Sequence, residues 1–132
     1  MPAGRHWAEA AAERLLTGLG WRVLARNYRL RGGELDLICD ADDGTVVFVE
    51  VRQRASDAFG GAAQSIDSRK LARLRRTAAH FLAYGLAAHR GHERGPGAGP
   101  GGAHGDERVR FDAVLVTGDE HEHVTRHVRD IL

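Results

Sequence analysis

The sequence predicts a single α/β domain in which a β-sheet is flanked by helices, and three observations predict it. Residues 4–19 and 67–84 repeat apolar side chains at helical spacing. Residues 32–39 and 46–52 are runs of β-branched and large apolar residues bounded by turn signals, which indicates strands. The order of helix, strands, helix, strand and terminal element then gives an α/β domain.

The composition excludes several classes of protein. A chain of 132 residues fits one domain with its own core. Nineteen lysines and arginines against 18 acids give a net charge of +1, so nucleic-acid binding would have to come from local patches. The one cysteine, Cys39, excludes an internal disulfide. Residues 1–12 are unlike a signal peptide, and no run approaches the length of a membrane span, so we expect a cytoplasmic protein with no membrane partner.

The first expected helix, residues 4–19, ends at Gly18 and Gly20. Its apolar face consists of Ala8, Ala11, Ala12, Leu15, Leu16 and Leu19. Glu9 lies at the border of this face, about 80° from its centre. Pairing with a neighbouring charge on the surface is the common fate of such a glutamate.

An arginine-rich run follows a short strand expected at residues 21–26. It comprises Arg26, Asn27, Tyr28, Arg29 and Arg31. Interleaved arginine and tyrosine suit phosphate contacts and base stacking, although an edge strand protected by charge has the same pattern. We favour nucleic-acid contact, because the run leads directly into the central pair of strands.

The two central strands are joined by Asp42-Asp43-Gly44, a natural three-residue hairpin loop that pairs Ala41 with Thr45. One face then carries the apolar pairs Leu35/Val51, Leu37/Val49 and Cys39/Val47. The other face carries Ile38/Phe48, Asp36/Glu50 and Glu34/Arg52.

The opposed carboxylates of Asp36 and Glu50 are the unusual feature of this hairpin. Their Cβ atoms would lie about 5 Å apart, where like charges repel. A divalent metal between them is one explanation, since Mg²⁺ takes carboxylate oxygens. The alternatives are a solvated face that Arg52 partly neutralises, or a bulge that shifts the register.

The second expected helix, residues 67–84, has two distinct faces. The buried face consists of Leu71, Leu74, Ala78, Phe81 and Leu82. The opposite side carries a basic stripe within an arc of about 60°, flanked by Lys70 and Arg75 and made of Arg69, Arg73, Arg76 and His80. No acid interrupts the stripe, so it is either solvated or bound to an anion. Beside the carboxylate pair, it indicates a phosphate backbone.

The remaining segments carry weaker signals. Residues 55–65 form a small-residue loop, and residues 89–107 are a flexible loop rich in glycine and proline. The histidines in and after that loop lack the paired spacing of a structural zinc site. Residues 109–117 indicate a strand, and residues 124–132 suit either a last strand or a short helix.

Several short blocks, in the right order, resemble the YraN-like family of uncharacterised bacterial proteins. They are Ala8-Glu9, Asn27-Tyr28-Arg29, Gly33-Glu34-Leu35-Asp36-Leu37-Ile38, Phe48-Val49-Glu50-Val51-Arg52-Gln53-Arg54, Phe59-Gly60, Lys70 and Arg110-Phe111-Asp112. That family is assigned to the restriction-endonuclease-like, PD-(D/E)xK nuclease superfamily, which also holds archaeal Holliday-junction resolvases. The resemblance implies a restriction-endonuclease-like domain with a mixed central sheet flanked by helices.

The resemblance also implies a metal-dependent DNA endonuclease of repair or recombination that acts on branched or single-stranded DNA. Asp36 and Glu50 would ligate Mg²⁺ or Mn²⁺, Glu34 would bind a second ion or orient water, and Glu9 would reach toward the site. The superfamily signature ends in lysine, whereas this chain has Arg52. Arginine stays protonated, so it cannot act as a general base, but it can clamp a phosphate.

The residues expected to bind nucleic acid are Arg29, Arg31, Arg54, Arg69, Lys70, Arg73 and Arg76. We expect DNA rather than RNA. Two alternatives stay open, a nucleic-acid-binding module that keeps the nuclease fold with little or no cleavage, and an adaptor that binds only protein. The basic stripe disfavours the adaptor. The oligomeric state is open, and a homodimer is one option.

Overall fold

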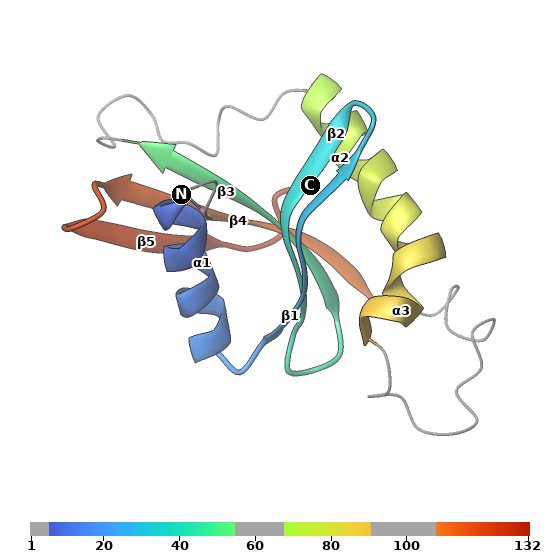
Figure 1. Ribbon diagram of the computed structural model, residues 1–132, viewed down its shortest axis with the longest axis horizontal. Helices are drawn as coiled ribbons and strands as arrows, with labels where there is room; N and C mark the ends of the chain where they lie inside the picture. Colours follow the sequence, from blue (N-terminus) through green and yellow to red (C-terminus); the bar gives the residue numbers. More distant parts are fainter. Residues whose placement is uncertain (1–5, 55–67, 91–107) are drawn as a thin grey trace.

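The computed structural model has a five-stranded sheet in the order β1-β2-β3-β4-β5 (Figure 1). The structure describes residues 6–54, 68–90 and 108–132. The elements are α1 (Trp7–Gly18), β1 (Arg22–Leu30), β2 (Gly33–Asp40), β3 (Val46–Arg54), α2 (Ser68–His80), the π-helical turn η2 (Phe81–Gly85), α3 (Leu86–Arg90), β4 (Val109–Gly118) and β5 (His123–Val128). Strands β3 and β4 pair in parallel and the other neighbours pair antiparallel, so the sheet is mixed, as predicted.

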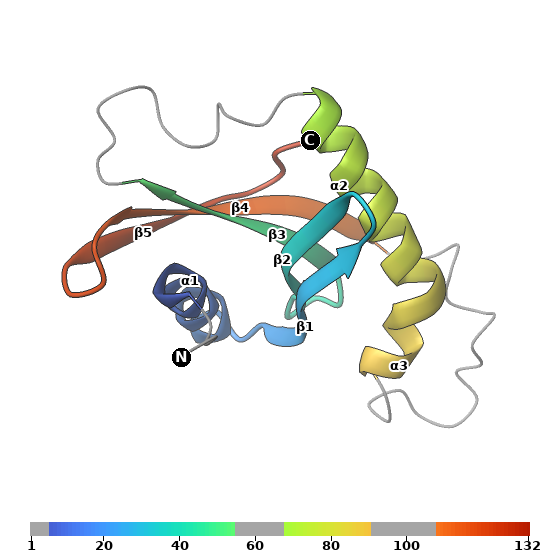
Figure 2. The ribbon, with the colours of Figure 1, turned by 45° about the horizontal axis from the view of Figure 1, so that its top comes forward.

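Helices cover opposite faces of this sheet, as Figure 2 shows for α1 on one side and α2 with α3 on the other. Helix α1 packs against β3 and β4, whereas α2 packs mainly against β2. The core under α1 includes Ala8, Ala12, Leu16, Leu37, Cys39, Val47, Val49, Val114 and Val116. The core under α2 includes Leu35, Ile38, Phe48, Leu74, Ala78, Phe81 and Leu86. Period-2 alternation separates the two cores along β3, whereas Leu35 of β2, predicted on the same face as Leu37 and Cys39, packs in the core under α2.

The first strand is longer than the sequence predicted. It continues past Arg26 to Leu30, because β1 pairs with β2 as far as Leu30 and Gly33. Arg26 and Arg29 therefore lie inside an edge strand, and the alternative of an edge strand carrying charge describes this run correctly. The glycine turn that follows has Gly32 at φ +85°, a conformation that favours glycine.

The second helix is also longer than predicted. It does not end at Tyr84 but passes through the π-helical turn η2 and ends at Arg90. The first two residues of the expected flexible loop, 89 and 90, are therefore helical. Residues 91–107, and the loop expected at 55–65, lie outside the described residues. The last element is a strand, β5, and the described helices include none long and apolar enough to cross a membrane.

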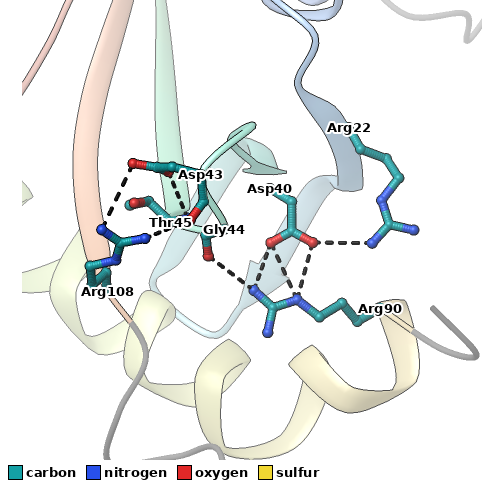
Figure 3. Close-up of polar contacts among 7 residues, drawn as sticks. All are labelled: Arg22, Asp40, Asp43, Gly44, Thr45, Arg90 and Arg108. Carbon is teal, nitrogen blue, oxygen red and sulfur yellow. Dashed lines mark hydrogen bonds and ion pairs between the residues drawn. The ribbon is translucent and has the colours of Figure 1, made fainter. Parts of the chain in front are cut away.

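A buried ion pair fixes α3 to the end of β2 (Figure 3). The Arg90 guanidinium donates from Nη2 to Asp40 Oδ1 at 2.7 Å and from Nε to Asp40 Oδ2 at 3.0 Å. The Arg90 side chain is 9% exposed, whereas Arg22, which pairs with the same carboxylate at 3.1 Å, is 43% exposed. This bidentate contact joins the helical connection between β3 and β4 to the β2–β3 hairpin.

The burial difference between the two arginines gives a stability prediction. Arg90→Ala leaves the Asp40 carboxylate partly buried with less compensation, so unfolding free energy falls by on the order of 3 kcal/mol. Arg22→Ala removes an exposed pair with the same carboxylate and costs less than about 1 kcal/mol. Urea unfolding of both variants measures the difference, and equal losses would contradict the role given to Arg90.

Candidate functional site

The candidate site lies where β2 and β3 part. The ladder pairs Cys39 with Val47, Ile38 with Phe48 and Leu37 with Val49, in the predicted register. The further predicted pairs, Leu35/Val51, Asp36/Glu50 and Glu34/Arg52, do not belong to the ladder of these two described strands. Figure 1 shows β2 and β3 diverging beyond this point.

Where the ladder ends, the side chain of Asp36 accepts a hydrogen bond from the backbone of β3. The Val51 N–H donates to Oδ2 of Asp36 at 2.8 Å, so the carboxylate takes the bond that a backbone carbonyl of β2 would otherwise accept. The strands separate just before the position where the two acids would be directly opposed. The hydrogen bond nevertheless keeps Asp36 beside Glu50.

Burial and mutual repulsion dominate the electrostatics of this pair. Glu50 is only 5% exposed. Burial of Asp36, followed by the charge of Glu50, raises the pKa of Asp36 to about 8, against the lowering effect of the Val51 N–H. The charge of Glu9 adds a smaller increase to this pKa, so α1 reaches the site electrostatically. Asp36 therefore holds a proton near neutral pH in the absence of a metal ion.

Two cationic side chains reach Glu50 from different elements. Lys70 on α2 places Nζ against Oε2 of Glu50, and Nη2 of Arg52 lies 3.4 Å from the same oxygen. The Nε of Arg52 is buried and has no hydrogen-bond partner within the described residues. Lys70 was predicted to contact phosphate from the helix surface, and the fold brings its ammonium to the carboxylate pair.

A cleft of about 160 Å³ opens over these groups. Its lining consists of Gly33, Glu34, Asp36, Glu50, Lys70, Arg73 and Leu74. The close approach of β2 and α2 depends on Gly33, because a Cβ there would collide with the hydroxyl of Thr77. That hydroxyl donates to the Arg73 carbonyl at 2.9 Å, so it cannot easily move. The cleft therefore places three acidic side chains of the sheet opposite two cationic side chains of α2.

The other predicted site residues differ in whether they reach the cleft. Glu34 lines the cleft but pairs with Arg29 rather than Arg52, with Arg29 Nε at 2.8 Å from Oε2. Arg31 and Arg54 are exposed at the end of the first hairpin and the end of β3.

The basic stripe on α2 has the orientation that the helical periodicity predicted. Arg69, Arg73 and Arg76 are exposed, and Leu74 and Ala78 on the opposite face are buried. Arg73 belongs to both the stripe and the cleft. The stripe therefore begins at the carboxylate pair and runs away from it along the helix.

Metal ligands other than the carboxylate pair do not gather in the described residues, where no group of three or more His, Cys, Asp or Glu side chains could hold an ion. The carboxylates that line the cleft are those of Glu34, Asp36 and Glu50, and Glu34 pairs with Arg29, so Asp36 and Glu50 offer the adjacent oxygens for a divalent cation. Both side chains offer the hard oxygen ligands that Mg²⁺ prefers.

A second buried carboxylate, Asp112, lies on the other face of the sheet and was not assigned a role from sequence. Arg110 donates to it from Nε at 2.8 Å, His127 Nε2 lies at 2.7 Å and the Asp130 N–H donates at 3.0 Å. Burial opposes ionisation of Asp112, but these contacts outweigh it and lower its pKa. This cluster ties β4, β5 and the following residues together, and its only sequence signal was the Arg110-Phe111-Asp112 block.

The fold and site define a single α/β domain with an acidic pair and cations at the opening of a mixed sheet. The chain belongs to the Uncharacterised protein family UPF0102, whose model matches residues 8–116. This confirms the resemblance to the YraN-like family.

Individual relatives match over most of the chain. A UPF0102 protein of Nitrosomonas europaea is 47% identical over 117 residues, which cover 89% of this chain and 83% of the relative. A UPF0102 protein of Paracidovorax citrulli is 47% identical over 116 residues, 83% of this chain and 73% of the relative. One of Mycobacterium tuberculosis is 54% identical over 76 residues, 57% of this chain and 59% of the relative.

The raised pKa of Asp36 gives a pH prediction for the metal-free protein. The unfolded carboxyl titrates near 3.8 and the folded one near 8, so the stability that comes from the bound proton is lost as pH rises between these values. Asp36→Asn keeps an acceptor for the Val51 N–H without the charge, and stabilises the protein at pH 8 by on the order of 2 kcal/mol.

Thermal melts in a chelator from pH 5 to 8 measure this effect, with Asp42→Asn in the exposed hairpin loop as the control. The melting temperature of the parent falls more steeply with pH than that of Asp36→Asn, and Asp42→Asn follows the parent. Parallel curves for parent and Asp36→Asn would contradict the raised pKa.

Proposed function

We propose that this chain is a metal-dependent nuclease that hydrolyses a phosphodiester bond of DNA. The observation that carries the proposal is the buried pair Asp36 and Glu50, held side by side with Lys70 and Arg52 around it. Placing two acids together in a cleft raises a pKa by several units and adds nothing to the core, which is typical of functional sites. A role in repair or recombination follows from the resemblance to nucleases.

Asp36, Glu50 and the Val51 carbonyl would hold Mg²⁺ or Mn²⁺. The residues fit such an ion because they offer hard oxygens, and because a cation would relieve the repulsion that keeps Asp36 protonated. Mg²⁺ sites commonly use one or two carboxylates together with substrate phosphates, so a third acid is not required. When bound, such an ion activates water and neutralises charge that grows on the phosphate.

The cations of the cleft would position the phosphate. Lys70 and Arg73 both line the cleft, so a phosphate that enters it meets an ammonium and a guanidinium. Arg52 stays protonated and contributes charge rather than proton transfer. Lys70 would supply from α2 the amine that position 52 lacks in this chain.

A second function, a nucleic-acid-binding module with little or no cleavage, has one observation in its favour. The ammonium of Lys70 already contacts Glu50 and partly balances the carboxylate pair without a metal ion. In such a module the basic stripe would bind the phosphate backbone, and the carboxylates would serve only to hold Lys70 and Arg52.

Calorimetry tests the metal site directly. The parent binds Mn²⁺ at pH 8, and Asp36→Ala and Glu50→Ala each lose this binding, because each removes one of two carboxylates. Binding weakens as pH falls, since the ion must displace the proton on Asp36. Asp42→Ala, which removes an exposed acid of the hairpin loop, binds like the parent. Unchanged Mn²⁺ binding in both Asp36→Ala and Glu50→Ala would contradict the proposed metal site.

Cleavage assays separate the two functions. With labelled branched, single-stranded and duplex DNA in Mg²⁺ or Mn²⁺, Lys70→Ala and Arg52→Ala each cleave more slowly by on the order of 10²-fold, the loss of one transition-state donor. Arg52→Lys keeps part of the activity, and the exposed Arg14→Ala on α1 keeps all of it. Mn²⁺ binding persists in every arginine and lysine variant. A parent that binds Mn²⁺ and DNA yet cleaves none of these substrates would establish the module instead.

A further inference from the structure

The basic stripe ends in an exposed aromatic residue. Tyr84, in the π-helical turn, is 76% exposed and is the most exposed large hydrophobic side chain among the described residues. Its ring lies against His80, with centroids 4.8 Å apart and a tilt of 48°. His80 belongs to the stripe, so the aromatic surface continues the row of Arg69, Arg73 and Arg76.

The His80 ring that contacts Tyr84 is held in place by a residue of the sheet. The Tyr28 hydroxyl on β1 lies 2.8 Å from Nδ1 of His80, and the Tyr28 ring packs edge-on against Phe81 at 5.1 Å. His80 therefore has a fixed orientation, and it supports Tyr84 from one side. A preformed aromatic platform loses little conformational entropy when a ligand stacks on it.

The π-helical turn sets where Tyr84 projects. The Leu86 N–H donates to the Phe81 carbonyl, a turn one residue longer than that of an α-helix. Gly85 permits this turn to lie on the aromatic core, because a Cβ there would meet the Phe81 ring at 2.8 Å and the Tyr28 hydroxyl at 3.4 Å. Such turns are frequent at functional sites.

The positive charge of this surface indicates the kind of ligand that it binds. Residues 68–90 contain arginines, one lysine and histidines but no acid. A surface with a row of cations and an exposed ring at its end fits a polyanion that also carries flat aromatic groups. Nucleic acid has this combination, since its phosphates pair with arginine and its bases stack on aromatic side chains. A paired base is already stacked on both faces inside a duplex, so only an unpaired base is free to stack on Tyr84.

We infer that Tyr84, supported by His80, stacks an unpaired nucleobase of a strand whose phosphates follow Arg76, Arg73 and Arg69 toward the carboxylate cleft. This inference rests on the nucleic-acid-binding part of the proposed function and names its substrate class, a single strand or a single-stranded branch. Arg73 and Tyr84 are separated by 11 residues, or about 16 Å of helix, which is roughly five nucleotide steps of a stacked strand.

Fluorescence anisotropy tests whether Tyr84 stacks an unpaired base. The probes are a labelled 20-nucleotide single strand and the matching duplex, and a chelator prevents cleavage. Tyr84→Ala weakens single-strand binding about tenfold, the effect of losing one stacked base, and changes duplex binding less than about twofold. Tyr84→Phe binds like the parent. Val124→Ala, which truncates another exposed apolar side chain on β5, also binds like the parent.

Salt dependence separates stacking from charge. Tyr84→Ala lowers affinity equally at every salt concentration, because no phosphate contact is lost. Arg69→Gln instead reduces the slope of log affinity against log salt by about 0.7 for single strands. If the parent binds DNA but Tyr84→Ala binds single strands with unchanged affinity, the inference is overturned while the nuclease proposal stands. A parent that binds neither the single strand nor the duplex would overturn both the stacking inference and the nuclease proposal.

Discussion

The interaction on which the site depends joins two acidic side chains, Asp36 and Glu50, that lie side by side where the β2–β3 ladder ends. Leu37 and Val49 form the last pair of the β2–β3 ladder, and the next bond joins the Val51 N–H to the Asp36 side chain. The hairpin therefore opens at one end while it stays closed at the other. The cleft lies at this opening, where burial and the charge of Glu50 raise the pKa of Asp36.

The connection between the two parallel strands contacts both ends of the β2–β3 hairpin. At the open end, Lys70 from the first turn of α2 reaches Glu50. At the closed end, Arg90 from the last turn of α3 forms a bidentate ion pair with Asp40. Each contact sets a cation from the helices against a carboxylate from the sheet. One stabilises the fold, and the other places a charge beside the candidate site.

Helix α2 combines three tasks on different sides. Leu74 and Ala78 pack into the core, Lys70 and Arg73 line the cleft, and Arg69 and Arg76 face solvent. This division follows from helical periodicity alone, since residues three and four apart share a side. The same helix therefore couples the position of the cations to the packing of the core, with Gly33 allowing the close approach of β2.

Much of this arrangement can be predicted from sequence because it depends on local rules. The hairpin loop with Gly44 fixed the register of Cys39 with Val47 and Leu37 with Val49, and alternation then assigned these four residues to one face, although Leu35 does not share it. Helical spacing separated the basic stripe from the buried face of α2. The pairing of the two acids as neighbours also came from local register, although their direct opposition did not occur.

Only the tertiary structure decided which distant groups meet. Lys70 and Glu50 are 20 residues apart, and Arg90 and Asp40 are 50 apart, so no spacing rule relates them. The longer first strand and the π-helical turn at Phe81 arise from pairing with β2 and from packing over Tyr28, which override local propensity. The sequence by itself determined the acids, the faces and the stripe. The fold decided where the strands open and which cations reach the opening, because long-range packing sets those distances.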